Sequence, residues 1–347
     1  MTPKVVLDGE QTLMETEAGE ASAAVARMLD ANRDGFAAIG VRLRTAPPAV
    51  VVTCARGSSD HAATYAKYLI ETTTGTPTAS AALSVASLYD APVVTGDRLC
   101  LAISQSGRSP DLLAAVEHQR AAGAFVVALV NAEDAPLCAL ADVVITLSAG
   151  TERSVAATKS YIASLAAIAA LVSAWAEDAA LADALTALPD ELERAFALDW
   201  SPAVDSYRHA TNLFVLGRGL GLAVAQEAAL KFKETSALHA ECFSSAEVRH
   251  GPMAIVGEAF PVLAFGGSDR AGTSVRDVAA EFRARGAAVL LADPDATVAD
   301  LPAIAAHPAI EPLLMIQSFY RMANALALAR GCNPDSPPHL NKVTETL

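Results

Sequence analysis

The sequence predicts an α/β protein with two tandem domains, each a three-layer αβα sandwich around a parallel sheet. Short apolar segments of strand type alternate with helical segments along the chain, which is the pattern of βαβ units. The pattern starts again near residue 210, and a chain of 347 residues is longer than one hydrophobic core usually allows. A duplicated domain therefore explains the length better than one large sheet.

The expected organisation has four parts. A helical N-terminal segment (1–45) precedes a first domain with its following helices (46–198), a second domain (199–330) and a C-terminal tail (331–347). In the N-terminal segment, an apolar stripe is available for packing and comprises Met14, Val25, Met28 and Leu29. Two prolines, Pro47 and Pro48, end this segment before the first strand.

The first domain is expected to contain strands at residues 49–54, 99–103, 125–130 and 143–147. These are continuous apolar runs, the kind buried on both faces of a parallel sheet. A turn of small residues at 55–60 follows the first strand and opens a helix. After the second strand, Ser109 can cap the next helix, Pro110 can take its first position, and Gly123 closes it. A long helical region is expected from Val155 to about Leu198.

An internal repeat appears when the second half is placed on the first at an offset of 162 residues. Residues 51–57 (VVTCARG) then align with 213–219 (LFVLGRG), and residues 103–106 (ISQS) align with 265–268 (FGGS). Order and spacing persist over most of each half, as expected of two copies of one domain.

Composition excludes several classes of function. A net charge of −14 and a pI near 4.9 argue against nucleic acid or an anionic membrane as partner. A phosphorylated small molecule stays compatible, because backbone amides and hydroxyls can hold one phosphate. The five cysteines show no CxxC spacing, which argues against a zinc site or a redox pair. Since no signal peptide follows Met1, and the apolar run Ile162 to Ala176 is short for a bilayer and reads as a buried helix, we expect a cytoplasmic protein.

A helix predicted around residues 226–235 carries three charged side chains at helical spacing. Glu227, Lys231 and Glu234 are four and three residues apart, so they lie on one face. With His250 arriving from a Gly-Pro turn, this set could transfer protons near neutral pH. The alternative is an ordinary surface ion pair, worth only about 0.3–0.5 kcal/mol.

Hydroxyl-rich turns follow two strands of the first domain, where ligands bind in open parallel sheets. The residues are Ser58, Ser59, Ser104, Ser106 and Ser109. The second copy has Leu220, Gly221, Gly266 and Gly267 in the corresponding places. Hydroxyls beside the amides of a helix N-terminus suit a phosphate dianion. The alternative is that these serines only cap helices.

Several separate motifs together resemble one family. They are Gly57-Ser58-Ser59, Ser104-Gln105-Ser106-Gly107, Gly150-Thr151-Glu152 with Val155 and Thr158-Lys159, Lys231 to Glu234 with His239-Ala240-Glu241, and His250-Gly251-Pro252. In this order they are similar to the sugar isomerase (SIS) half of glucosamine-6-phosphate synthase, from about residue 30 to the end. The resemblance implies two SIS domains of flavodoxin-like topology and a phosphosugar site formed in a homodimer.

The resemblance also implies roles for single residues. Phosphate and sugar contacts would come from Ser59, Ser104, Gln105, Ser106 and Ser109, with Ser58 in the same turn, and Val155 would contact sugar hydroxyls through its backbone. Glu234 would be the base that moves a proton between C1 and C2, with Lys231 as its neighbour. His250 would open the sugar ring from the second subunit, and Lys342 would match the lysine that meets the carbonyl carbon in the synthase.

The sequence also departs from the synthase. Thr2 follows Met1 where the synthase has its glutaminase cysteine, and only about 45 residues precede the first strand, so no glutamine-hydrolysing half is expected. The turn Arg108-Ser109-Pro110 resembles that of the stand-alone SIS-type glucosamine-6-phosphate deaminases. No serine follows Lys342, which leaves the geometry of that residue open.

The expected function is therefore an enzyme of amino sugar metabolism that deaminates glucosamine 6-phosphate to fructose 6-phosphate and ammonia by hydrolysis of an imine. No metal or organic cofactor is expected, since His239 and Glu241 would supply only two ligands; His61 could touch ligand or be structural. Two alternatives stay open. One is another SIS reaction: an ammonia-dependent synthase, a galactosamine-6-phosphate deaminase or isomerase, or a fructosamine-phosphate deglycase. The other is a phosphosugar sensor without catalysis.

Overall fold

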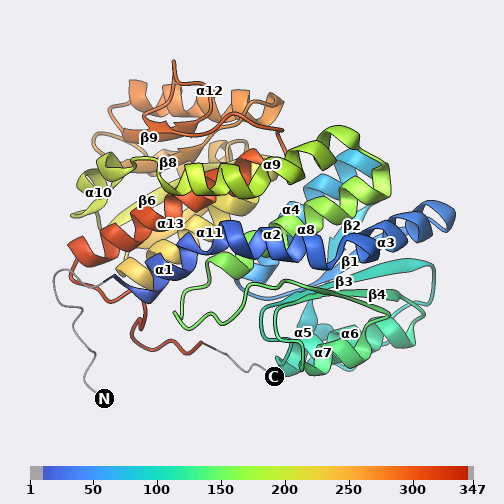
Figure 1. The fold of residues 1–347 in the computed structure, drawn as a ribbon. Coiled ribbons are helices and arrows are strands. Elements are labelled where there is room, and N and C mark those ends of the chain that lie inside the picture. The colour runs from blue at the N-terminus through green and yellow to red at the C-terminus, as the bar shows by residue number, and fades with distance from the viewer. Residues whose placement is uncertain (1–10, 343–347) are drawn as a thin grey trace. The chain divides into compact units, whose positions relative to one another are not determined.

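The computed structural model describes residues 11–342 (Figure 1). Residues 1–10 of the predicted N-terminal segment and residues 343–347 of the predicted tail lie outside this range. The chain divides into two compact units. One unit, with residues 23–151 and 160–186, carries the first sheet; the other, with residues 11–22, 152–159 and 187–342, carries the second.

The N-terminal segment is helical, as predicted. It forms α1 (Leu13–Gly19), α2 (Ala21–Ala31) and α3 (Arg33–Thr45). Within the expected apolar stripe, Met14, Val25 and Met28 are buried and Leu29 is half-buried. The apolar spacing therefore identified the packed faces of α1 and α2.

The first sheet has five parallel strands in the order β2-β1-β3-β4-β5. They are β1 (Val50–Cys54), β2 (Thr78–Ser80), β3 (Arg98–Ser104), β4 (Phe125–Val130) and β5 (Val143–Thr146). Four of them are the predicted apolar runs. The edge strand β2 escaped prediction because its three residues, Thr-Ala-Ser, carry no apolar run.

Helices cover both faces of this sheet. They are α4 (Ser58–Thr74), α5 (Leu83–Ser87), α6 (Pro110–Ala121), α7 (Pro136–Leu140) and α8 (Lys159–Ala176). In Figure 1, α5, α6 and α7 lie together on one side of the strands, with α4 and α8 on the other. The core on the α5–α7 side is built from small and branched residues such as Ala102, Val116 and Val126.

The second sheet repeats this topology. Its strands are β6 (Asn212–Gly217), β7 (His239–Ser244), β8 (Pro261–Phe265), β9 (Ala288–Asp293) and β10 (Leu301–Pro302). The order is β10-β9-β8-β6-β7, and every pair is parallel. Read from the other edge and renumbered from β6, this is 2-1-3-4-5, the order of the first sheet. Both sheets therefore have the predicted flavodoxin-like order.

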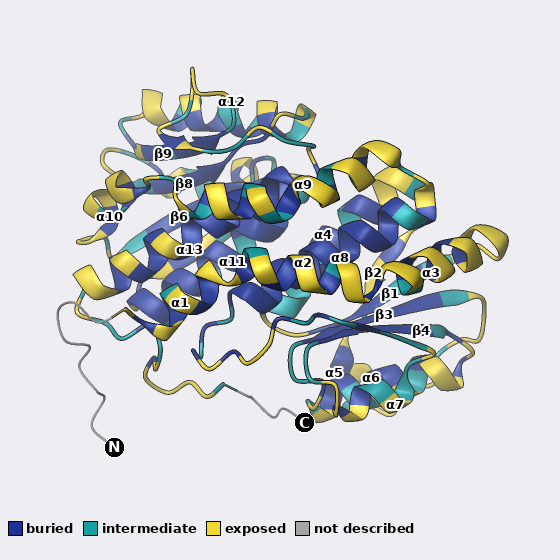
Figure 2. Ribbon diagram, viewed as in Figure 1, coloured by how far each residue is buried: buried dark blue, intermediate teal, exposed yellow. Residues whose placement is uncertain are grey.

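The helices of the second unit pack on its sheet in the same way. They are α10 (Ser201–Tyr207), α11 (Leu220–Ser236), α12 (Arg270–Ala284) and α13 (Glu311–Ala329), with the short 3₁₀ turns η1 (Glu247–His250) and η2 (Pro252–Ile255). The helix α9 (Ala179–Phe196) belongs to the first unit up to residue 186 and to the second from residue 187. Figure 2 shows α11 and α13 as largely buried helices, whereas α12 exposes one face. The helix α11, which carries the charged residues, thus lies inside its unit.

The duplication extends to backbone angles. Gly57 has φ +55° and ψ −132°, and Gly219, at the offset of 162, has φ +57° and ψ −130°. Each caps a helix of 17 residues, α4 and α11. Glycine is required at both positions because an L side chain rarely adopts this conformation.

The long helical region differs from the prediction. Its first helix begins at Lys159 rather than Val155, and a residue with positive φ, Glu177, separates it from α9. Residues 153, 154 and 158 donate their backbone N–H groups to glutamate side chains instead of to a helical ladder. These bonds satisfy N–H groups of an irregular segment, with bends at residues 154–156, that precedes the helix start.

One described helix, α8, is long and apolar enough to cross a membrane by length and composition. It has 18 residues, three more than the apolar run from Ile162 to Ala176, so the expectation of a segment short for a bilayer is wrong for the helix that contains the run. In the structure 89% of it is buried, as predicted for a core helix.

Candidate active site

The predicted serine turns lie at the carboxyl ends of β1 and β3. These neighbouring strands are where the order of the first sheet reverses, and ligands bind at such a point in open α/β sheets. Ser58 and Ser59 form the first turn of α4, while Ser104, Gln105 and Ser106 follow β3. Apart from Ser104, which is buried, these side chains are half-buried. The structure therefore gathers them at one edge of one sheet.

Ser104 has a local structural role, whereas Ser109 does not make the side-chain cap that was the alternative. The Ser104 hydroxyl accepts the Gly107 N–H at 2.9 Å and so shapes the turn. Ser109 occupies the N-cap position of α6 in extended conformation, but its side chain accepts no capping hydrogen bond. Ser109 is therefore at the expected N-cap position but does not make the expected hydrogen bond; the Leu112 N–H, which such a cap could bind, donates to the Asp111 carboxylate at 2.8 Å.

An ion pair that the sequence analysis missed links the two turns. Arg56, just after β1, donates to the fully buried carboxylate of Asp111 on α6 at 2.9 Å. Asp111 also accepts the Leu112 N–H at 2.8 Å. The sequence shows an arginine after one predicted strand and an aspartate after the next. The two meet only because β1 and β3 are neighbours in the sheet.

The charged residues of α11 form a buried row. Lys231 lies 3.3 Å from Glu227 and 2.5 Å from Glu234, with Glu227 fully buried and Lys231 1% exposed. The Tyr320 hydroxyl donates to Glu227 at 3.2 Å. The helical spacing predicted this shared face correctly, whereas the alternative of a surface ion pair is wrong, since only Glu234, at 20%, is partly accessible.

The electrostatic balance keeps Lys231 charged. Burial lowers the pKa of Lys231, but the charges and hydrogen bonds of Glu227 and Glu234 together raise that pKa above its ordinary value. A permanently charged ammonium between two carboxylates can orient Glu234 and offset negative charge nearby. It cannot accept a proton itself.

Glu234 faces a cavity of about 740 Å³ with mainly apolar walls. The cavity lies between the end of α11, the end of α13 and tail residues such as Asn333 and His339. Its volume is in the range of small-molecule sites. A partly accessible carboxylate on such a cavity is placed to contact a ligand.

The predicted ring-opening residue lies elsewhere on the second unit. His250 ends the 3₁₀ turn η1, is exposed, and does not line the cavity that contains Glu234. The following Gly251 has φ +147°, so the chain turns sharply after it. The expectation that a second subunit supplies His250 stays a prediction.

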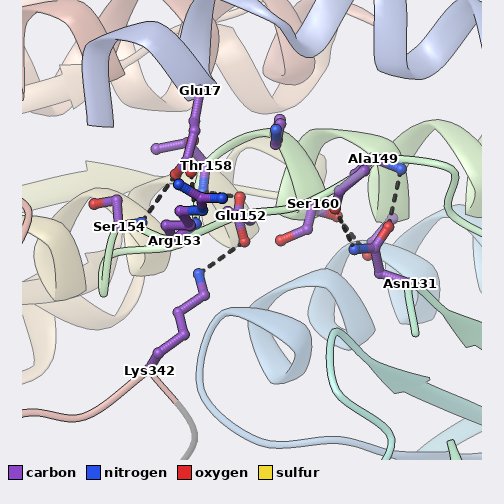
Figure 3. A network of polar contacts seen from close by, with 12 residues as sticks. Glu17, Asn131, Ala149, Glu152, Arg153, Ser154, Thr158, Ser160 and Lys342 are labelled. Carbon is purple, nitrogen blue, oxygen red and sulfur yellow. Dashed lines mark hydrogen bonds and ion pairs between the residues drawn. The ribbon is translucent and has the colours of Figure 1, made fainter. Parts of the chain in front are cut away.

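The segment with Val155 forms a polar network with α1 and the tail (Figure 3). Glu152 accepts the Thr158 N–H at 3.0 Å and binds the Lys342 ammonium at 3.0 Å. Glu17 accepts the backbone N–H groups of Arg153 and Ser154. Burial raises the pKa of Glu17, the two backbone bonds lower it, and the net direction is upward. In the sequence Glu152 stands out only as part of a motif, and Glu17 has no local signal.

Candidate metal ligands do not gather in the described part of the chain. Among residues 11–342, no group of three or more His, Cys, Asp and Glu side chains could hold a metal ion. His239 and Glu241 are exposed on β7, and His61 is half-buried in the first turns of α4.

Comparison with known proteins supports the topology. The SIS domain model matches residues 48–174 and 206–302, which contain the first and second sheets respectively. The chain belongs to the SIS domain family. Both matched segments end close to the last strand or helix of a repeat, so the duplication seen in the backbone is a duplication of SIS domains.

Relatives of this SIS protein include curated enzymes and solved structures. It is 33% identical over 362 residues to a glutamine–fructose-6-phosphate aminotransferase (isomerizing) of Symbiobacterium thermophilum, covering 98% of this chain and 58% of that protein. The chain thus spans little more than half the length of that relative.

A crystal structure of a candidate phosphosugar isomerase from Silicibacter pomeroyi DSS-3 matches with TM-score 0.89 and 43% identity, over 94% of this chain and all of that one. The C-terminal domain of glucosamine–fructose-6-phosphate aminotransferase from Francisella tularensis matches with TM-score 0.84 and 26% identity, over 96% and 100%.

Proposed function

We propose that this SIS protein isomerises a phosphorylated amino sugar and deaminates it, converting glucosamine 6-phosphate and water to fructose 6-phosphate and ammonia. The observation that carries the proposal is the buried row Glu227, Lys231 and Glu234, which ends at a cavity of ligand size. Moving a proton between neighbouring carbons needs a fixed base with a fixed cation beside it, and this row supplies both.

The proposed reaction begins with ring opening. His250, supplied by the second subunit of a homodimer, moves a proton from the O1 hydroxyl to the ring oxygen and frees the C1 aldehyde. Glu234 then takes the proton from C2, the C1–C2 double bond forms, and O1 takes a proton from the substrate's own C2 ammonium group, which gives a neutral enolamine with a hydroxyl at C1. Returning a proton to C1 yields an imine at C2. Water adds to that imine and ammonia leaves, so atoms and charges balance.

The phosphate would bind at the serine turns of the first sheet. The N-terminus of α4 and the hydroxyls of Ser59, Ser106 and Ser109 offer donors there, and Arg56 adds a positive charge beside them. Gln105 and the backbone of Val155 are the proposed sugar contacts. Lys231 and Lys342 are the proposed cations that offset charge on the enolate-like intermediate.

The main alternative is the same chemistry run in reverse with free ammonia. The aminotransferase name of the Symbiobacterium thermophilum relative supports a reaction that adds an amino group to fructose 6-phosphate, and every proton transfer above is reversible. A sensor without turnover is less consistent with a buried Glu-Lys-Glu row, because burying three charges costs free energy that ligand binding alone does not require.

The test measures ammonia and fructose 6-phosphate released from glucosamine 6-phosphate by the purified chain. Glu234→Gln is expected to lower kcat by about 10²–10⁴-fold, since it removes a general base while keeping the shape. Glu193→Gln, an exposed glutamate on α9, is the matched control and should leave the rate unchanged.

Galactosamine 6-phosphate is run as the competing substrate, and fructose 6-phosphate with ammonium tests the reverse direction. No turnover of any of these, with saturable phosphosugar binding retained, would refute the proposed enzyme and leave the sensor.

A further inference from the structure

Two buried carboxylates hold the segment from Glu152 to Lys159 in the second unit. Glu17 on α1 is 5% exposed and accepts the N–H of Arg153 at 2.5 Å and of Ser154 at 3.1 Å. Glu152 uses one oxygen for the Thr158 N–H at 3.0 Å. These bonds take the place of helical hydrogen bonds before α8 and tie the segment, which bends at residues 154–156, to its surroundings.

The second oxygen of Glu152 binds the tail. Its distance to the Lys342 ammonium is 3.0 Å, the Glu152 side chain is fully buried, and Lys342 is 23% exposed. Figure 3 shows Lys342 reaching from the tail toward Glu152, with Glu17 approaching the same segment from α1. A buried carboxylate that has both oxygens occupied cannot swing away without losing a backbone bond, so it is a rigid partner for the lysine.

The tail is tied to the same segment upstream of Lys342. The Asp335 carbonyl accepts the Val155 N–H at 3.2 Å, and the Asp335 carboxylate accepts the N–H groups of Leu13 and Met14 at 2.8 Å each. The Val155 N–H is thereby used inside the protein, which leaves its carbonyl as the main-chain group able to meet a sugar hydroxyl. The two tail contacts, at Asp335 and Lys342, bracket the last residues of the described chain.

We propose that Glu152 is a positioning residue for Lys342, holding the lysine ammonium against the segment 152–159 that also carries Val155. This inference rests on the proposed function, because Lys342 receives its role there. Glu152 itself touches no reacting atom. It acts by fixing where the cation stands when substrate arrives, and Glu17 keeps the segment that carries Glu152 in place.

A double-mutant cycle tests whether Glu152 acts through Lys342. Glu152→Gln is expected to lower kcat about a hundredfold with little change in KM, the size of loss that misplacing a catalytic group produces. The double variant Glu152→Gln/Lys342→Met should have the same kcat as the single variant Lys342→Met. Losses that multiply in the double variant would overturn the proposal. If Glu152→Gln does not fold, Glu152→Asp, which keeps the charge but retracts it, takes its place in the cycle with the same expectation.

A second measurement does not depend on turnover. The rate of acetic anhydride labelling at Lys342, followed by peptide mass spectrometry, should rise several-fold in Glu152→Gln. Glu20→Gln is the matched control, since Glu20 pairs with Lys159 in the same network and does not contact Lys342. Equal labelling in the wild type and Glu152→Gln would overturn the positioning role. If the wild type releases no ammonia, the proposed function fails while this labelling still decides the positioning.

Discussion

The two SIS domains share a strand order and a first turn, yet each carries the polar residues that the other lacks. At the offset of 162 residues, Tyr65 and Leu69 of α4 correspond to Glu227 and Lys231 of α11, and all four are buried. Conversely, the hydroxyls of Ser58 and Ser104 correspond to Leu220 and Gly266. The first copy thus keeps the turns suited to an anion, and the second keeps the charged helix.

The turn after β8 shows how the second copy fills its unused anion position. The Ser268 N–H, which corresponds to that of Ser106, donates to the carboxylate of Glu311 at 2.9 Å, and Glu311 also accepts the Ala306 N–H at 3.3 Å. Glu311 is 2% exposed, and the remaining cavity beside it is about 10 Å³, no more than the space of one water molecule. An internal carboxylate stands where the first copy is proposed to hold a phosphate.

This difference shows that the second copy keeps the backbone N–H donors at its switch point although it is not proposed to bind phosphate there. The amides at the switch point still need acceptors, because buried unpaired N–H groups are costly. One copy is free to recruit an external anion, and the other satisfies the same donors from its own chain.

The largest expected effect concerns the buried helix of the second copy. Lys231→Met should lower the free energy of unfolding by about 3–5 kcal/mol, because it leaves Glu227 buried without its cation. Leu69→Met at the corresponding position of α4 should cost less than about 1.5 kcal/mol. Urea denaturation of both variants measures the contrast, and equal costs would contradict it.

The pH dependence of this pair follows from the raised pKa of Lys231. Stability from a group whose folded pKa is raised is fully present below its unfolded pKa, here near 10.5, and is lost as the pH rises through the folded value. Lys231 is therefore charged in both the folded and the unfolded chain between about pH 6 and 9. The loss of unfolding free energy caused by Lys231→Met should not change with pH in this range. A penalty that disappears within this window would show that Lys231 is neutral when folded.

An intermediate effect is expected at the filled switch point. Glu311→Ala should destabilise the protein by about 1–3 kcal/mol, because the Ser268 N–H loses its acceptor. Inorganic phosphate should then raise Tm more in Glu311→Ala than in the wild type, since an external anion can take the vacant place. Glu311→Gln keeps an oxygen acceptor and is the control. Identical phosphate responses in all three proteins would refute the idea of a self-filled anion position.

The smallest expected effect compares two matched serines. Ser106→Ala should raise KM for the phosphosugar about tenfold by removing one hydrogen bond to a charged group. Ser268→Ala, its exposed counterpart, should leave KM unchanged. Steady-state kinetics of the two variants suffices, and equal shifts would mean that the hydroxyls of the first copy do not bind the phosphate.

Local patterns predicted much of this protein. Apolar runs located four strands of the first sheet, the offset of 162 residues located the second copy, and helical spacing placed Glu227, Lys231 and Glu234 on one face. The three-residue strand β2 and the start of α8 were missed, because neither depends on an apolar run. Strand pairing determines the first, and side chains distant in sequence determine the second.

The sequence by itself determined the fold class, the duplication and the residue types of the candidate site, because periodicity and turn chemistry act over a few residues. Only the tertiary structure decided which charges are buried and which partners they meet. Glu227 is buried where Tyr320 of α13 donates to it, and Glu152 meets Lys342 across 190 positions of sequence. Burial and long-range pairing are properties of packing, and no local pattern of residues records them.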